Sequence, residues 1–298
     1  MPELPQMQAL AERLDAVARG RSFAGFDAYS FSSLKTVVPP ESLIGHSIVG
    51  VDRRGKYLVF DVGAAGRLLV HLSQAGRLDV EDPPKKTKPR GAVVRIRLGP
   101  LHGSLPDRAG PHAAPEARSG GPALLVREYG TERKAAWWVL APGDDGPLAN
   151  LGPEPDSDAF AELVLRGDDR RRIHTLLRDQ RTVAGVGRGY ADDALWRAQL
   201  SPYATLASLD ADARRRLLEA VRSVMADGLE RERARSGGLS EPKLGGSFDV
   251  HGRFGAPCPR CGDTMHRVSY ESHEVTYCSR CQTGGKVLAD RRMSRLLK

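Results

Sequence analysis

Four cysteines near the end of the chain have the spacing of a metal site. They form two pairs, CPRC and CSRC, separated by sixteen residues. Each pair fits a tight turn, and two such turns bring four thiolates into the tetrahedral geometry of structural zinc. Because four thiolates leave no open coordination position, we expect one structural Zn²⁺ rather than a catalytic metal. The expected ligands are Cys258, Cys261, Cys278 and Cys281.

The start of the chain places a proline directly after the initiator methionine. Removal of Met1, which is usual before a small residue, exposes the secondary amine of Pro2. An α-amine titrates near pH ~8, well below the ~10.4 of a lysine, so it is substantially neutral at physiological pH. A neutral amine attacks an aldehyde or hemiacetal carbon and forms a Schiff base. Pro2 is therefore a candidate nucleophile and Glu3 a candidate proton shuttle; the alternative is that Pro2 only stabilises the chain end.

The composition favours a nucleic-acid partner. Among 298 residues, 45 Lys and Arg stand against 37 Asp and Glu, which gives a formal net charge of +8. A basic balance of this kind indicates a polyanionic partner, and nucleic acid is the foremost of these. Basic residues also surround the cysteine tail, as in ribbons that clamp nucleic acid. A ribbon that binds protein and carries a solvated basic rim is the alternative.

The sequence predicts a cytoplasmic protein with no membrane partner. No run of about 18 or more apolar residues occurs, so no segment is predicted to span a membrane. The N-terminus lacks a basic stretch followed by an apolar one, so no secretion signal is predicted. The clustering of all the cysteines in one tail agrees with metal binding in a reducing compartment.

The segments between the two ends predict a β-rich first half and a helical second half. Apolar residues at helical spacing from Met7 to Val17 predict a leading amphipathic helix. Residues 100–121, rich in Pro, Gly and Ala, predict a long insertion in a hairpin. The predicted strands are HSIVGVDRR, KYLVFDV, GRLLVHLS, AVVRIRL and AAWWVLA. The predicted helices are DAFAELVL, RRIHTLLRDQ, YADDALWRAQL and the long segment that begins at LDADARRR.

Several of these segments resemble, in order, the formamidopyrimidine-DNA glycosylase / endonuclease VIII family of base-excision repair enzymes. MPELP opens the chain and the four-cysteine ribbon closes it, as in that family. RRGKYLVF resembles the family's hairpin with a second catalytic lysine, here Lys56, and VAGVGRGYADDALWRAQLSP resembles its helix–two-turn–helix segment. FDVHGRFGAPCPRCG and YCSRCQTGGK resemble the opening and closing turns of its ribbon. The resemblance covers essentially the whole chain.

This resemblance implies an α+β multidomain fold. It implies an N-terminal β-sandwich catalytic domain with a leading helix over residues 1–145, and a helix–two-turn–helix DNA-binding domain over residues 151–240. A four-cysteine zinc-ribbon domain would follow over residues 247–298. The expected partner is double-stranded DNA that contains damaged bases or abasic sites, bound between the two halves of a monomer. A nucleoid-associated location follows from that partner.

The resemblance also implies a reaction. A damaged base is flipped out of the duplex, because its glycosidic carbon is out of reach inside the stack. The Pro2 amine attacks C1′ and displaces the base, Glu3 assists by proton transfer to the opening sugar, and Lys56 contacts substrate phosphate and base. The iminium makes the C2′ proton acidic, so the strand breaks by β-elimination, often followed by δ-elimination. We therefore expect a bifunctional DNA glycosylase and abasic-site lyase that needs no diffusible cofactor.

The family's DNA-contacting positions match with several departures. The expected DNA contacts are Arg133, Arg188, Tyr190 and His273, of which Arg188 stands for a phosphate-binding asparagine and His273 for an arginine at the ribbon tip. Gln6 replaces a usual glutamate, Gln74 stands near a usual methionine that fills the void of the flipped base, and Ala135 replaces an aromatic residue. Oxidised purines, oxidised pyrimidines and bare abasic sites all remain possible substrates.

These departures keep two other functions open. The first is a non-catalytic protein that binds damaged DNA or abasic sites with the same fold. The second is an unrelated basic zinc-ribbon protein that binds RNA or takes part in translation.

Overall fold

The computed structural model describes residues 1–101, 120–129, 134–235, 248–270 and 273–289, although the side chains of Tyr270 and His273 are outside this description. The described chain divides into two compact units. The first unit comprises residues 1–2, 6–149 and 233–245, and the second comprises residues 3–5, 150–232 and 246–298. The helical segment and the cysteine ribbon, expected as separate domains, therefore group in one compact unit.

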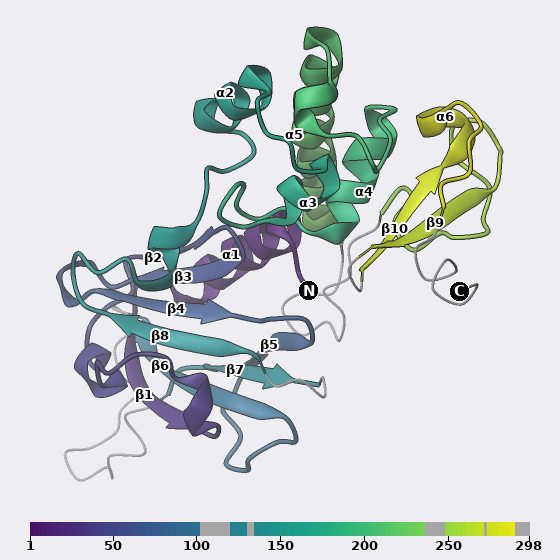
Figure 1. The fold of residues 1–298 in the computed structure, drawn as a ribbon. Helices are drawn as coiled ribbons and strands as arrows, with labels where there is room; N and C mark the ends of the chain where they lie inside the picture. Colours follow the sequence, from purple (N-terminus) through teal and green to yellow (C-terminus); the bar gives the residue numbers. More distant parts are fainter. Residues whose placement is uncertain (102–119, 130–133, 236–247, 271–272, 290–298) are drawn as a thin grey trace, which may run out of the picture. The chain divides into compact units, whose positions relative to one another are not determined.

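The first unit contains two four-stranded antiparallel sheets, with strand orders β1-β6-β7-β5 and β2-β3-β4-β8 (Figure 1). The strands are β1 (Arg21–Ala28), β2 (Gly50–Arg54), β3 (Tyr57–Asp61), β4 (Arg67–His71), β5 (Gly76–Glu81), β6 (Ala92–Leu101), β7 (Ala123–Glu128) and β8 (Ala136–Leu140). Helix α1 (Leu4–Ala18) precedes them. The predicted β-sandwich with a leading helix is confirmed.

The core of the first unit follows from strand alternation. Side chains of a strand point to opposite faces, so alternate residues face the core between the sheets. Strand β3 buries Leu58 and Phe60, and its neighbour β4 buries Leu68 and Val70. These residues join those of the other sheet and the apolar face of α1 in one buried cluster. All five predicted segments contain strands, and the predicted insertion connects the antiparallel pair β6 and β7; its residues 102–119 are outside the described residues.

The second unit contains the predicted helices and the cysteine ribbon. Its helices are α2 (Asp158–Arg166), α3 (Ile173–Arg178), α4 (Arg188–Arg197) and α5 (Ala211–Ala234). Helix α2 begins after Ser157, whose hydroxyl accepts the Phe160 N–H, and it ends at Gly167 in the left-handed conformation. Apolar side chains of all four helices form one buried cluster. Among the described residues, no helix combines the length and the apolar character that crossing a membrane requires.

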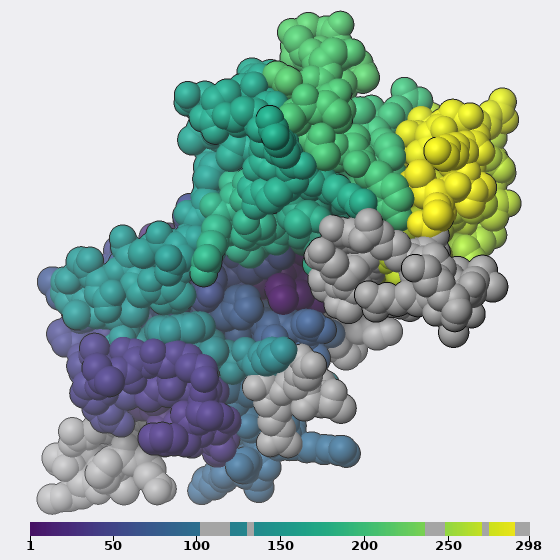
Figure 2. All heavy atoms as spheres, viewed as in Figure 1, coloured from purple at the N-terminus to yellow at the C-terminus, as the bar shows by residue number. Residues whose placement is uncertain are grey.

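The ribbon is a two-stranded antiparallel sheet followed by a short helix. Strand β9 (Met265–Tyr270) pairs with β10 (His273–Cys278), and α6 (Ser279–Thr283) follows directly. Both β10 and α6 contact helix α4. The space-filling view shows the yellow ribbon packed directly against the green helical segment (Figure 2). Helix α4 is therefore the element on which the ribbon rests.

Candidate functional site

The carboxylate of Glu3 is buried at the start of helix α4. It accepts hydrogen bonds from the backbone N–H groups of Gly187 at 2.7 Å, Gly189 at 2.9 Å and Tyr190 at 3.3 Å. The first turn of a helix leaves such N–H groups without partners inside the helix, and its dipole favours a negative charge there. A β-carbon at Gly187 would collide with the Glu3 side chain, so glycine permits this close approach. Glu3 is thus held in one orientation.

The other two predicted catalytic residues belong to the first unit. Pro2 is buried, whereas the preceding Met1 is about half exposed (51%). Lys56 is 7% exposed and occupies, with Gly55, the two-residue turn between β2 and β3. Gly55 has a φ of 57°, the left-handed conformation that tight hairpin turns require. The role predicted for the Pro2 amine would require removal of Met1, because the Pro2 nitrogen is otherwise part of a peptide bond.

His71, at the end of β4, lies in the electrostatic field of Lys56. Burial and the Lys56 charge lower the pKa of His71 to about 4. Its ring also packs against Tyr57, with 4.8 Å between the ring centroids. His71 is therefore neutral at physiological pH. Sequence reasoning did not select it, although a histidine that ends a strand beside the Lys56 hairpin is a signal that could have found it.

A buried aspartate on α4 joins two histidines and the ribbon. Asp192 is completely buried, and its carboxylate oxygens lie 3.0 Å from His174 Nε2 and 2.7 Å from His251 Nδ1. The backbone N–H of Thr276 in β10 donates to it at 3.1 Å. Burial alone would raise the pKa of Asp192, but the two histidine contacts lower it. Burial would likewise lower the pKa of His251, but its hydrogen bond with Asp192 and the charges of Asp192, Glu3 and Asp193 raise it.

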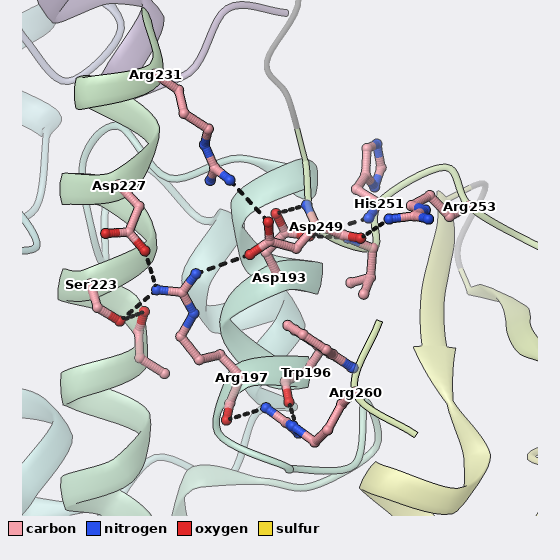
Figure 3. A network of polar contacts seen from close by, with 12 residues as sticks. Asp193, Trp196, Arg197, Ser223, Asp227, Arg231, Asp249, His251, Arg253 and Arg260 are labelled. Atoms are coloured by element: carbon pink, nitrogen blue, oxygen red, sulfur yellow. Dashed lines mark hydrogen bonds and ion pairs between the residues drawn. The ribbon is translucent and has the colours of Figure 1, made fainter. Parts of the chain in front are cut away.

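The next residue, Asp193, fixes the segment that leads into the ribbon. Its carboxylate accepts the backbone N–H groups of Asp249 at 2.7 Å, Val250 at 2.9 Å and His251 at 3.2 Å (Figure 3). Burial, together with the charge of Asp249, raises the pKa of Asp193 to about 6 despite these donors. The α4 pair Asp192–Asp193 is thus the polar anchor between the helices and the ribbon.

Two arginines surround Asp249 and complete this anchor. Arg197, the last residue of α4, contacts Asp227 at 2.5 Å and Asp249 at 2.9 Å. Arg231 of α5 contacts the second oxygen of Asp249 at 2.9 Å. Figure 3 shows both guanidinium groups converging on Asp249 from α4 and α5. The start of the ribbon segment is therefore tied to two helices by charge.

The four cysteines meet as predicted. Their sulfur atoms all lie within 4.8 Å of one another, with 3.9 Å between those of Cys258 and Cys281 and 3.5 Å between those of Cys261 and Cys278. A tetrahedral zinc site with Zn–S bonds of about 2.3 Å has sulfur separations of about 3.8 Å. Burial acts to raise the pKa of the Cys258 thiol, but N–H donors around its sulfur, including the Trp196 indole, lower it to about 6. The four sulfurs therefore fit a metal ion.

The predicted DNA contacts fall in different environments. Arg188 is exposed at the first residue of α4, beside the N–H groups that hold Glu3. Tyr190 is fully buried in the core of the second unit, where its ring meets Phe248 edge-on at a centroid distance of 5.1 Å. The Tyr190 side chain thus contributes to core packing, and its ring has no exposed surface that could contact DNA. Arg133 lies outside the described residues, and for His273 only its place at the start of β10 is described.

The structure also shows where three other residues that depart from the family pattern lie. Gln6 is buried on α1, and Ala135 is buried just before β8. Gln74 is exposed in the turn between β4 and β5, where Ser73 has a positive φ of 57°. Gln74 is thus exposed beside a residue in the left-handed backbone conformation.

Known proteins match this chain along most of its length. Residues 1–103 match the formamidopyrimidine-DNA glycosylase N-terminal domain, and residues 151–238 match the formamidopyrimidine-DNA glycosylase H2TH domain. The formamidopyrimidine-DNA glycosylase of Thermus thermophilus is 33% identical over 298 residues, which span 96% of this chain and 100% of that protein. The chain belongs to the formamidopyrimidine-DNA glycosylase family.

Solved structures of the formamidopyrimidine-DNA glycosylase family have the same fold. The crystal structure of MutM (Fpg) from Thermus thermophilus matches with a TM-score of 0.75 and 28% identity, covering 96% of this chain and 100% of that one. The Lactococcus lactis enzyme bound non-covalently to DNA with an AP site matches with a TM-score of 0.75 over 94% of this chain and 99% of that one. At 21% identity, this second match shows the shared fold.

Proposed function

We propose that this protein removes oxidised bases from double-stranded DNA and then cleaves the resulting abasic site, with the amine of Pro2 as the nucleophile. The observation that carries the proposal is the position of Glu3. The residue after the proposed nucleophile is buried, and three backbone N–H groups at the start of α4 fix its carboxylate. A carboxylate held in this way is preorganised to exchange a proton with a bound sugar.

The steps balance without an oxidant or reductant. The Pro2 nitrogen bonds to C1′ of the deoxyribose while the bond from C1′ to the base breaks, and the base leaves with a proton. Glu3 takes up the proton that the Pro2 nitrogen loses and passes it to O4′ as the sugar ring opens, and the nitrogen becomes an iminium. Loss of the C2′ proton then breaks the C3′–O bond and releases the phosphate-bearing strand. Water hydrolyses the iminium and restores the amine.

Lys56 and His71 support this proposal from the first unit. Burial and the Lys56 charge depress the pKa of His71, so a neutral imidazole at the end of β4 interacts with the cation in the β2–β3 turn. The charged Lys56 and the neutral His71 would both donate N–H groups to the phosphates beside a lesion, and because His71 is neutral the pair adds only one buried charge. We assign Lys56 to substrate phosphate and base, and Arg188, Arg133 and His273 to the DNA backbone.

The zinc ion that Cys258, Cys261, Cys278 and Cys281 would hold has a structural role in this proposal. Four thiolates fill its coordination sphere, so the metal supplies rigidity to the ribbon and no chemistry at the sugar. The basic residues around the ribbon would then meet DNA phosphates.

Borohydride trapping tests the proposal. The processed protein is incubated with an abasic-site duplex and borohydride, which reduces the iminium to a stable protein–DNA adduct. We expect a trapped adduct whose peptide map places the DNA on the Pro2 nitrogen. Glu3→Gln should lower single-turnover base excision by about 100- to 10,000-fold, the range for loss of a proton-transfer group. Lys56→Ala should still give the adduct, which would show that the trapped amine is that of Pro2 and not that of Lys56.

The burial of Pro2 and the uncharged Gln6 favour one second candidate, a protein that binds abasic DNA without reaction. Tight binding of abasic DNA with no adduct, in material that mass spectrometry shows to lack Met1, would establish this candidate. An adduct on material that retains Met1 would exclude the Pro2 amine. A panel of duplexes with oxidised purines and oxidised pyrimidines then identifies the substrate.

A further inference from the structure

Trp196 brings an N–H donor from helix α4 to a sulfur of the cysteine cluster. Its indole Nε1 lies 3.3 Å from Cys258 Sγ and donates a hydrogen bond to it. The side chain is 8% exposed and packs in one cluster with Val250, Met265 and the cysteines. The core of the ribbon is therefore completed by a residue of the helical segment.

Arg260 fixes the orientation of this indole. It lies between Cys258 and Cys261, and its guanidinium carbon stands 4.4 Å from the centroid of the Trp196 ring. Its nitrogens donate to the carbonyl oxygens of Trp196 at 3.0 Å and Arg197 at 3.2 Å (Figure 3). These carbonyls end helix α4, where a cation is favoured by the helix dipole. The cysteine turn thus covers the end of α4 and keeps the indole N–H aimed at the sulfur.

An N–H donor at this position would stabilise the negative charge of the thiolates in a metal site. Four thiolates around one Zn²⁺ carry a net charge of −2, which is unfavourable in a buried environment. A hydrogen bond to a charged acceptor is roughly twice as strong as a neutral one, and partners that orient and neutralise ligands raise metal affinity. We propose that the Trp196 indole N–H is an outer-sphere donor to the Cys258 thiolate, and that it sets how tightly the ribbon holds its metal.

A matched pair of variants tests the effect on affinity. Trp196→Phe keeps an aromatic ring on α4 but removes the N–H. Trp137→Phe makes the same change in the first unit, where the buried Trp137 indole donates to Ser33 Oγ at 3.0 Å. In competition with a chromogenic chelator, the full-length Trp196→Phe protein should bind zinc about 10-fold more weakly. The Trp137→Phe protein should match the parent. Equal zinc affinity of Trp196→Phe and the parent would overturn the proposal.

Two spectroscopic measurements test the hydrogen bond itself. In the Co²⁺-loaded protein, loss of the donor raises the energy of the sulfur electrons, so Trp196→Phe should shift the thiolate-to-metal charge-transfer band to lower energy. In the parent protein loaded with a spin-active cadmium isotope, the Trp196 Nε1 proton should show scalar coupling to the metal through Cys258 Sγ. The second measurement needs no Trp196 variant, because Trp137→Phe and Trp138→Phe assign the other two of the three indole signals. An indole proton without this coupling would contradict the assignment.

Discussion

The Glu3 carboxylate accepts the Gly187 N–H at 2.7 Å, and a β-carbon on Gly187 would occupy the space that this carboxylate fills. The two residues are 184 positions apart in the sequence. The absence of a side chain at Gly187 is therefore a condition for the orientation of Glu3. This relationship can be broken without any change to Pro2, Glu3 or Lys56.

Gly187→Ala should displace Glu3 and impair base excision while DNA binding persists. A misplacement of a catalytic group by about 1 Å can cost about 100-fold in rate, so a loss of that order is expected in single-turnover excision. Gly120→Ala is the matched control, because a β-carbon there meets nothing within 4 Å. Wild-type excision by Gly187→Ala would show that the orientation of Glu3 does not limit the reaction.

His71 should titrate far below an ordinary histidine. Its pKa of about 4 results from burial and from the Lys56 charge, so its ring signals in NMR should change near pH 4 rather than near 6.5. Lys56→Ala removes one of the two causes and should raise the midpoint toward 6.5. The signal is assigned by its loss in His71→Asn. A midpoint that stays unchanged in Lys56→Ala would mean that the two side chains do not interact.

Residue types and spacing alone indicated candidate residues at the two ends of the chain, whereas the candidates in the middle came from the family resemblance. The cysteine spacing is local, so the cluster of four thiols was predictable, and Glu3 was chosen for its place beside Pro2. The Asp192 cluster was not found, because its partners His174 and His251 lie 18 and 59 residues away. Tyr190 was expected to contact DNA from its place in a motif, but tertiary packing buries its ring.

Some strands were also missed, because the contacts that stabilise them come from distant segments of the sequence. Strands β1, β5 and β7 were not predicted, and β1 and β5 contain charged residues that hide the alternating pattern. Two of those charges are paired within the sheet: Glu81 of β5 contacts Arg95 of β6, across the intervening β7, at 2.7 Å, and Asp27 of β1 contacts Arg97 of β6 at 3.1 Å. A cross-strand ion pair of this kind stabilises a strand, but a single segment of sequence does not reveal it.

Asp193 should make the stability of the second unit depend on pH. Its folded pKa of about 6 exceeds the ordinary 3.8, so between these values the folded state binds the proton more tightly than the unfolded state. Its contribution is therefore present at low pH and is lost as the pH rises through about 6. The uncharged Asp193→Asn should gain stability relative to the parent over this window, as measured by urea unfolding. A difference between the two proteins that is constant with pH would refute the assignment.

Arg188 should contribute one phosphate contact to DNA binding. It is exposed at the first residue of α4, next to the N–H groups that hold Glu3. Arg188→Ala should weaken binding to all sequences alike and reduce the slope of log affinity against log salt by about 1. Arg166→Ala is the control, because Arg166 is an exposed arginine at the end of α2 that already pairs with Asp168 at 2.8 Å. Equal salt slopes for the Arg188 variant and the parent would remove Arg188 from the interface.

Metal removal should unfold the ribbon but leave the rest of the chain folded. The two units have separate cores, and the helices have a buried cluster of their own, whereas the ribbon has two small clusters, one of which includes the four cysteines. Chelation or Cys258→Ser should therefore abolish amide-exchange protection in β9 and β10 and preserve it in β3, β4 and α5. DNA affinity should fall with the ribbon, while borohydride trapping at saturating abasic DNA persists, because the Pro2 amine is untouched. Full DNA affinity after complete metal removal would show that the ribbon has no part in DNA binding.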